Sequence, residues 1–204
     1  MKQIQTYEDV LSRKNIINKD RAWDIPGGVS IKPDNLIRGR FLPEGTPVAP
    51  PNASGYRRVC KQALVLEGSS AQLLIVDKKF NHFKEGDIVM KSKGTSNKAY
   101  KIASVLATAG DKEVLKVSTV IATVTKSTKP FLICEAATVR VGTTSTTEIK
   151  TKSTPDCITK FGMEVPNADL VMLPVGVYTR ADVLENTIAD PYLDQLKHIN
   201  VIKY

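Results

Sequence analysis

From residue 56 to residue 178 the chain alternates short hydrophobic runs with clusters of Gly, Asn, Asp and Ser. The runs are rich in Val, Ile, Thr and Leu, which favour β-strands. No helical periods separate them, so their close spacing predicts antiparallel sheets in a small β-barrel or sandwich. The expected strands are at 59–66, 72–77, 87–91, 98–106, 113–119, 120–125, 131–135, 137–141, 158–164 and 168–178.

The first fifty or so residues have a different pattern. Residues 7–15 predict a short helix, in which Tyr7, Val10 and Leu11 share one face. Frequent prolines and glycines between residues 26 and 51 then block both helix and central strand, which predicts an extended arm. The arm is too apolar for a solvated tail, so we expect it to lie against its own body or against a neighbour. The apolar residues are Trp23, Ile25, Val29, Ile31, Leu36, Ile37, Phe41 and Leu42.

Threonine dominates the segment 136–160, with five consecutive Thr or Ser residues at 143–147. Isolated β-branched polar residues suit exposed edge strands, which can pair between subunits. They suit a mobile surface loop equally well. The sequence leaves both interpretations open.

The chain ends in a pattern typical of a short helix. Asp190 is a good N-cap, and Pro191 then stands at the favoured first helical position. Residues 199–204 alternate well enough to predict a final short strand. The helix would present one apolar face, formed by Tyr192, Leu193, Leu196 and Ile199.

The composition fits a folded protein with a mainly aliphatic core. Of the 204 residues, 42% are hydrophobic and 25% are charged, which excludes wholesale disorder, while only 6% are aromatic. No apolar stretch is long enough to insert into a membrane, and residues 1–9 show no secretory signal. Three widely spaced cysteines, Cys60, Cys134 and Cys157, predict buried, reduced thiols.

The charge balance is basic, since 29 Lys and Arg exceed 21 Asp and Glu to give a net charge of +8. Such an excess first suggests nucleic acid, but the basic residues are dispersed and no recognition motif accompanies them. We therefore expect a solvated lysine-rich surface and no nucleic-acid partner. Arg38 and Arg40 lie within the apolar arm and could pair with acidic groups on a partner.

Candidate chemistry is sparse. His82 is expected in a surface turn and His198 at a helix end, and neither has the neighbours of a catalytic triad or a metal site. Cys157 follows Asp156, a carboxylate that discourages thiolate formation. No phosphate-binding glycine motif is present. The sequence therefore predicts no enzyme, no catalytic residue, no cofactor and no metal.

Three motifs in order resemble the capsid decoration and head fibre proteins of tailed bacteriophages. Residues 36–48 are similar to the opening of these proteins, in which a strand reaches a Leu-Pro-x-Gly-Thr-Pro turn. Residues 82–89 resemble the His-hydrophobic-x-x-Gly-Asp turn of the head fibre family, followed by a Lys-Ala-Tyr strand at 98–100. Residues 192–204 look like the C-terminal helix and strand of decoration proteins.

The resemblance implies a virion structural protein that is made in the host cytoplasm and binds the major capsid protein on the outer surface of the head. It also implies a homo-oligomer, commonly a homotrimer, with a homodimer as the alternative. The expected organisation is a capsid-binding arm at 1–51 and a β body at 52–204. The arm's expected capsid contacts are Trp23, Ile25, Ile31, Ile37, Arg38, Arg40, Phe41 and Leu42.

Two other functions are open. A carbohydrate- or cell-surface-binding β module would need exposed aromatic side chains, and the host surface would then be a partner. A small hydrolase would depend on His82 or Cys157, which no motif supports.

Overall fold

The computed structural model of the chain describes residues 21–70, 72–92, 97–108, 110–118, 130–141, 148–167, 172–184 and 187–202. Three expectations lie outside these residues: the helix at 7–15, the strand at 120–125 and the centre of the threonine-rich segment at 143–147.

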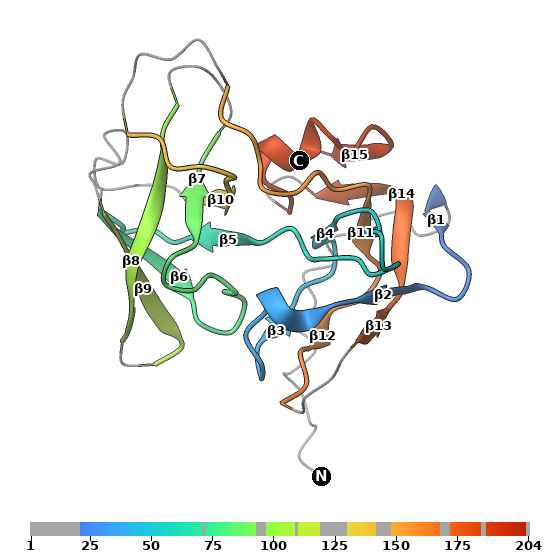
Figure 1. Cartoon of the computed structure of the whole chain (residues 1–204), viewed down its shortest axis with the longest axis horizontal. Coiled ribbons are helices and arrows are strands. Elements are labelled where there is room, and N and C mark those ends of the chain that lie inside the picture. Colours follow the sequence, from blue (N-terminus) through green and yellow to red (C-terminus); the bar gives the residue numbers. More distant parts are fainter. Residues whose placement is uncertain are drawn as a thin grey trace.

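Six antiparallel strands form a closed barrel, at the left of Figure 1. This confirms the expected mainly β fold, and of the two expected architectures the structure contains the closed barrel. The interior is mostly aliphatic, and Phe83 and Tyr100 are its fully buried aromatic side chains. Around the barrel the order is β10 (Phe131–Glu135), β5 (Gln62–Val65), β6 (Leu73–Asp77), β9 (Lys112–Val117), β8 (Ala99–Ala107) and β7 (Ile88–Met90).

A second unit, at the right of Figure 1, is built from both ends of the described chain. Its main sheet has the order β1 (Trp23–Asp24), β14 (Val177–Leu184), β11 (Cys157–Thr159) and β4 (Pro47–Val48), and β15 (Ile199–Ile202) runs parallel to β14. Two further pairs join β2 (Val29–Ile31) to β13 (Leu173–Val175) and β3 (Phe41–Leu42) to β12 (Met163–Glu164).

The sheet pairing thus divides the chain differently from the expected boundary at residue 51. Four strands between residues 23 and 48 pair with strands between residues 157 and 184, and the barrel is inserted between these halves. The apolar N-terminal segment therefore packs against the body of its own chain. Its side chains share a core with the C-terminal half: Ile31, Leu36, Leu42, Val48, Cys157, Val165 and Val177.

The barrel packs on the second unit through another core. Cys60, Met90 and Cys134 cover the outside of the barrel, and Tyr178 and Tyr192 cover them from the other side. Tyr192 belongs to α2 (Asp190–Leu193), which confirms the short C-terminal helix, although its N-cap is Ala189 rather than Asp190. A 3-10 turn, η2 (Pro33–Asn35), is the other short helical element described.

Two expected strands are each divided in the structure. The run at 158–164 splits into β11 and β12 around Gly162, where an added Cβ would lie 2.6 Å from a ring carbon of Phe41. The run at 168–178 splits into β13 and β14 at Gly176. At 137–141 the chain forms no named strand and bridges Ala99 only through Arg140. Hydrophobic pattern locates these segments but does not show where they bend.

The three cysteines are buried and free, as expected. Burial raises the pKa of Cys157 to about 12 and that of Cys60 well above its usual value. Both thiols are therefore poor nucleophiles at neutral pH. Among the described residues no helix has the length and apolarity needed to cross a bilayer.

If the N-terminal segment is part of the folded body, Gly28→Ala should lower the free energy of unfolding by more than about 2 kcal/mol. Gly28 has φ of +70°, and a Cβ there would lie 2.6 Å from the carbonyl oxygen of Val175. Gly27→Ala is the matched control, because Gly27 has φ of +81° but no atom near its Cβ position, and it should cost about 1 kcal/mol. Urea denaturation measures both; equal effects would contradict the packing of β2 on β13.

Candidate functional site

The largest exposed aromatic side chains of the described residues both belong to the second unit. Trp23 is 65% exposed and Phe161 is 54% exposed. The ammonium of Lys160 lies 5.5 Å from the Phe161 ring centroid and 2.9 Å from a carboxylate oxygen of Asp24, the residue after Trp23. The guanidinium of Arg180 lies 5.5 Å from the Trp23 ring centroid. We call these five residues the Trp23–Phe161 surface.

Strand pairing holds this surface in place. Trp23 pairs with Arg180, and the next residue, Asp24, pairs with Tyr178. Adjacent residues of β1 face opposite sides of the sheet, since Ala22 packs against the core that contains Tyr178 and Ile25 packs against the core that contains Val177. Asp24 is therefore on the side of Tyr178 and Lys160, and Trp23 is on the other side of this edge strand. The hydroxyl of Thr179, at the irregularity, donates to the carbonyl of Trp23. Trp23 therefore stands on a paired strand rather than on a loose tail, and Phe161 lies in the short bend between β11 and β12.

The surface combines flat aromatic rings with cationic groups. The ion pair with Lys160 lowers the pKa of Asp24 and raises that of Lys160, so both are charged at neutral pH. Rings and guanidinium groups of this kind provide contact area, stacking and hydrogen-bond donors, which suits reversible binding. The surface contains no cysteine, histidine or serine that could act as a nucleophile or proton carrier.

The other expected capsid contacts have different positions. Ile31 and Leu42 are core residues, Ile25 packs against the same core, and Ile37 and Phe41 are half-buried. Arg38 is exposed in the turn before β3. Of the eight expected capsid contacts, Trp23 alone belongs to the Trp23–Phe161 surface. The sequence analysis did not single out Phe161, because it lies within the expected strand at 158–164.

Arg40 pairs within the protein rather than with a partner. Its guanidinium donates to both carboxylate oxygens of Glu113, at 2.5 and 3.0 Å, and to the carbonyl of Asn81 at 2.7 Å. Glu113 is 3% exposed and also accepts from the side chain of Asn81. This bidentate ion pair fastens the N-terminal segment to the end of the barrel.

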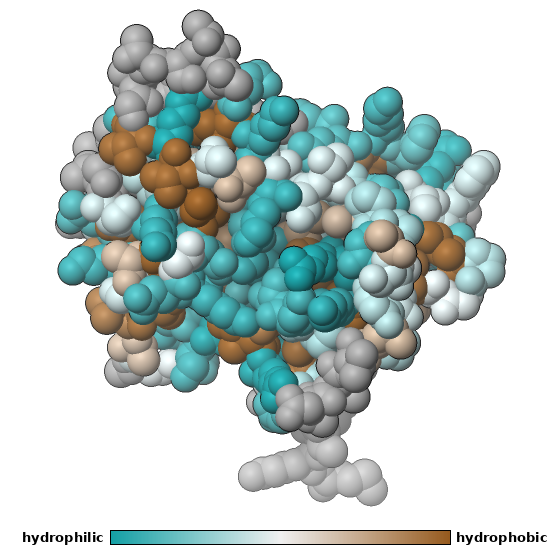
Figure 2. Space-filling model, viewed as in Figure 1, coloured by the Kyte–Doolittle hydropathy of each residue, from teal (hydrophilic) through white to brown (hydrophobic). Residues whose placement is uncertain are grey.

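Other basic residues of the expected clusters are also paired internally. Arg57 contacts Asp156 and Arg58 contacts Asp34, each at 2.5 Å. Figure 2 shows one face of the molecule as mostly hydrophilic, with hydrophobic residues gathered over the barrel at the upper left. Part of the excess of basic residues is therefore used in ion pairs within the protein rather than in one positively charged patch.

His82 is buried, which corrects the expected surface position. It is 3% exposed, its Nδ1 accepts from the amide of Ile37 at 3.1 Å, and its Nε2 lies 3.3 Å from the carbonyl of Phe41. Because Nδ1 accepts, the proton of the neutral ring is on Nε2. Burial, reinforced by the nearby cations Arg40, Lys61 and Lys84, lowers the pKa of His82 to about 4.

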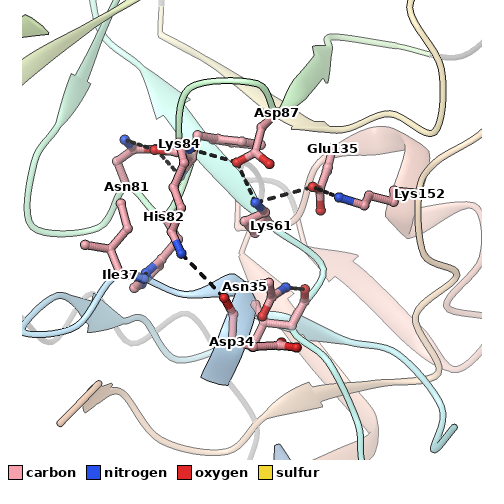
Figure 3. Close-up of polar contacts among 12 residues, drawn as sticks. Asp34, Asn35, Ile37, Lys61, Asn81, His82, Lys84, Asp87, Glu135 and Lys152 are labelled. Carbon is pink, nitrogen blue, oxygen red and sulfur yellow. Dashed lines mark hydrogen bonds and ion pairs between the residues drawn. The ribbon is translucent and has the colours of Figure 1, made fainter. Parts of the chain in front are cut away.

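A second charged cluster, beside His82, is shown in Figure 3. The ammonium of Lys61 lies 2.5 Å from Asp87 and 3.3 Å from Glu135, and Glu135 also contacts Lys152 at 2.7 Å. Lys61 and Glu135 are each 3% exposed. Sequence reasoning missed this cluster because its members are far apart in the chain. Within the described residues no group of three His, Cys, Asp or Glu side chains could hold a metal ion.

Comparisons of the chain with protein-family models, curated proteins and solved structures gave no match. The resemblance to head fibre proteins therefore stays a hypothesis that rests on the motifs at 36–48, 82–89 and 192–204.

Lowering the pH from 7 to 4 should destabilise the protein through His82. The folded-state pKa of about 4 lies below the ordinary value of 6.5, so the stabilisation is complete above pH 6.5 and is lost as the pH falls toward 4. The loss should reach about 3 kcal/mol. Urea denaturation as a function of pH measures it. His82→Asn should flatten this dependence, whereas the control His198→Gln, at an exposed position, should leave it unchanged; the same slope in both variants would contradict the prediction.

Proposed function

We propose that the protein is a virion structural protein, a head fibre or capsid decoration protein, that binds the outer surface of a phage head as a homo-oligomer. The observation that carries the binding role is the Trp23–Phe161 surface. It lies partly on the N-terminal segment that the resemblance assigns to the capsid contact, and it includes Trp23 itself.

The geometry supports this role in two ways. Each aromatic side chain can bury roughly 150–250 Å² against a partner, and the paired strands mean that little order has to be gained on binding. Lys160 and Arg180 would meet acidic groups on the capsid exterior. In a homo-oligomer the surface would be repeated, so several weak contacts would act together.

The second candidate is a carbohydrate- or cell-surface-binding module. The observation that favours it is the 65% exposure of Trp23, because flat aromatic rings can stack on sugars. Both candidates use the same surface but bind different ligands. The experiments therefore measure binding to phage heads and to glycans.

The test uses substitutions at the surface rather than removal of residues 1–51, which would delete four strands of the folded body. Trp23→Ala and Phe161→Ala should each weaken co-sedimentation with purified phage heads at least about 10-fold, as expected for central aromatic contacts. Leu106→Ala is the matched control, since Leu106 is 47% exposed on β8 of the barrel. It should bind as the unchanged protein does.

Circular dichroism and light scattering would verify that each variant keeps its fold and oligomeric state. Full head binding by both aromatic variants would reject this surface as the capsid contact. Binding to a glycan array that depends on Trp23, with no affinity for heads, would favour the second candidate.

Head binding should also weaken as salt is added, because the cations of the surface would face acidic groups. Arg180→Gln should reduce this salt dependence, whereas Lys116→Gln, on the barrel strand β9, should not. Co-sedimentation at increasing sodium chloride concentrations measures the dependence, and an affinity that does not respond to salt would contradict an acidic partner.

A further inference from the structure

Lys61, Glu135 and Asp87 lie side by side at one end of the barrel. Lys61 immediately precedes β5, Glu135 ends β10, and Asp87 immediately precedes β7; β10 pairs with both other strands. The amide of Glu135 donates to the carbonyl of Lys61, and Glu135 is opposite Val89. Because alternate residues of a strand share a face, the three side chains are on the same face as Ala63, Ile133 and Val89, which line the barrel interior.

The three groups are enclosed and in reach of one another. The side chain of Asp87 is 14% exposed, and those of Lys61 and Glu135 are 3% and 4% exposed. The ring of Phe83, which is fully buried, has its centroid 5.7 Å from the Lys61 ammonium. Figure 3 shows Lys61 between the two carboxylates. An apolar enclosure disfavours charged forms, so transfer of a proton from the ammonium to a carboxylate, which leaves two neutral groups, is easier there than in water.

We propose that Lys61 and Asp87 become joined by an intramolecular isopeptide bond, and that Glu135 carries the protons for this reaction. The ammonium of Lys61 first gives a proton to Asp87, which leaves an amine facing a neutral carboxylic acid. The amine nitrogen attacks Cγ of Asp87 to form the C–N bond. Glu135 takes a proton from that nitrogen and returns it to the departing hydroxyl, so that the C–O bond breaks and water leaves.

The reaction balances without any added reagent. One ammonium and one carboxylate give one amide and one water molecule, and Glu135 ends in the state in which it began. No atom is oxidised or reduced. The distance of 2.5 Å between Lys61 Nζ and Asp87 Oδ2 places the reacting groups in contact before the reaction.

Neighbouring groups hold this arrangement. Lys152 contacts the Glu135 carboxylate at 2.7 Å and holds it in position beside Lys61. The hydroxyl of Tyr192 donates to the carbonyl of Lys61 and accepts from the amide of Glu135. The amide of Lys84 donates to Asp87 at 2.8 Å. Each reacting group is thus fixed by a contact outside the reaction itself.

A second lysine–aspartate pair provides an internal comparison. Lys160 and Asp24 are 2.9 Å apart, but their side chains are 27% and 49% exposed. Water stabilises both charges there, and the Trp23–Phe161 surface contains no second carboxylate that could carry protons as Glu135 does. We expect no bond there.

The experiment is intact-mass spectrometry of the purified, denatured full-length protein. The expected mass is that of the sequence less one water molecule, and a protease digest should contain a branched peptide that joins the fragments holding Lys61 and Asp87. Lys61→Arg keeps the positive charge but cannot form the amide, so it should show the full mass. Glu135→Gln should slow or abolish the loss of water. Lys160→Arg, the matched control, should lose water as the unchanged protein does.

A full mass for the unchanged protein would overturn the proposal. So would a loss of water that persists in Lys61→Arg, because it would indicate a succinimide or another dehydration. Complete bond formation in Glu135→Gln would overturn the role of Glu135. Circular dichroism verifies that the variants are folded, and the result is independent of whether the protein binds phage heads.

Discussion

The ion pair between Arg40 and Glu113 is the constraint on which the relation between the two units depends. Glu113 points into the end of the barrel, where an unpaired carboxylate would be strongly destabilising. Arg40 satisfies it from outside the barrel, in a segment that also donates the amide of Ile37 to His82. The amide of Phe41 donates to the carbonyl of Lys79 as well. A barrel built from the middle of the chain is thereby fastened to strands that precede it.

These contacts between the N-terminal segment and the barrel also determine the position of the Trp23–Phe161 surface. Once residues 34–41 are held on the barrel turn, β3 and β4 continue directly into pairs with β12 and β11. β11 pairs with β14, and β14 pairs with β1, which carries Trp23. The position of Trp23 thus follows from a chain of hydrogen-bonded strands that begins at a buried charge. The proposed capsid contact, supported in this way, would lose little conformational entropy on binding.

The sequence predicts well those features that local pattern controls. The runs at 72–77 and 98–106 correspond to β6 and β8 within one residue at each end, because each is bounded by its own turn residues. The closing helix and strand are likewise visible in local pattern. What the sequence does not reveal is pairing over long distances: the contact of Arg40 with Glu113, the burial of His82, and the meeting of Lys61 with Asp87 and Glu135. Charged and polar residues are expected to be exposed to solvent, and only the folded structure shows which of them are buried.

The charged groups at the end of the barrel and those of the Trp23–Phe161 surface are stabilised in different ways, because the first are buried and the second are exposed. At the Trp23–Phe161 surface, water stabilises each charge separately, because the side chains of Lys160 and Asp24 are 27% and 49% exposed. At the barrel end, Lys61 has exchanged water for two carboxylates and an aromatic ring, so loss of either carboxylate would leave a buried positive charge without full compensation. Replacing two charges by an amide removes that dependence, because a neutral amide needs only hydrogen bonds. The proposed isopeptide bond between Lys61 and Asp87 would therefore also stabilise the fold at this end of the barrel.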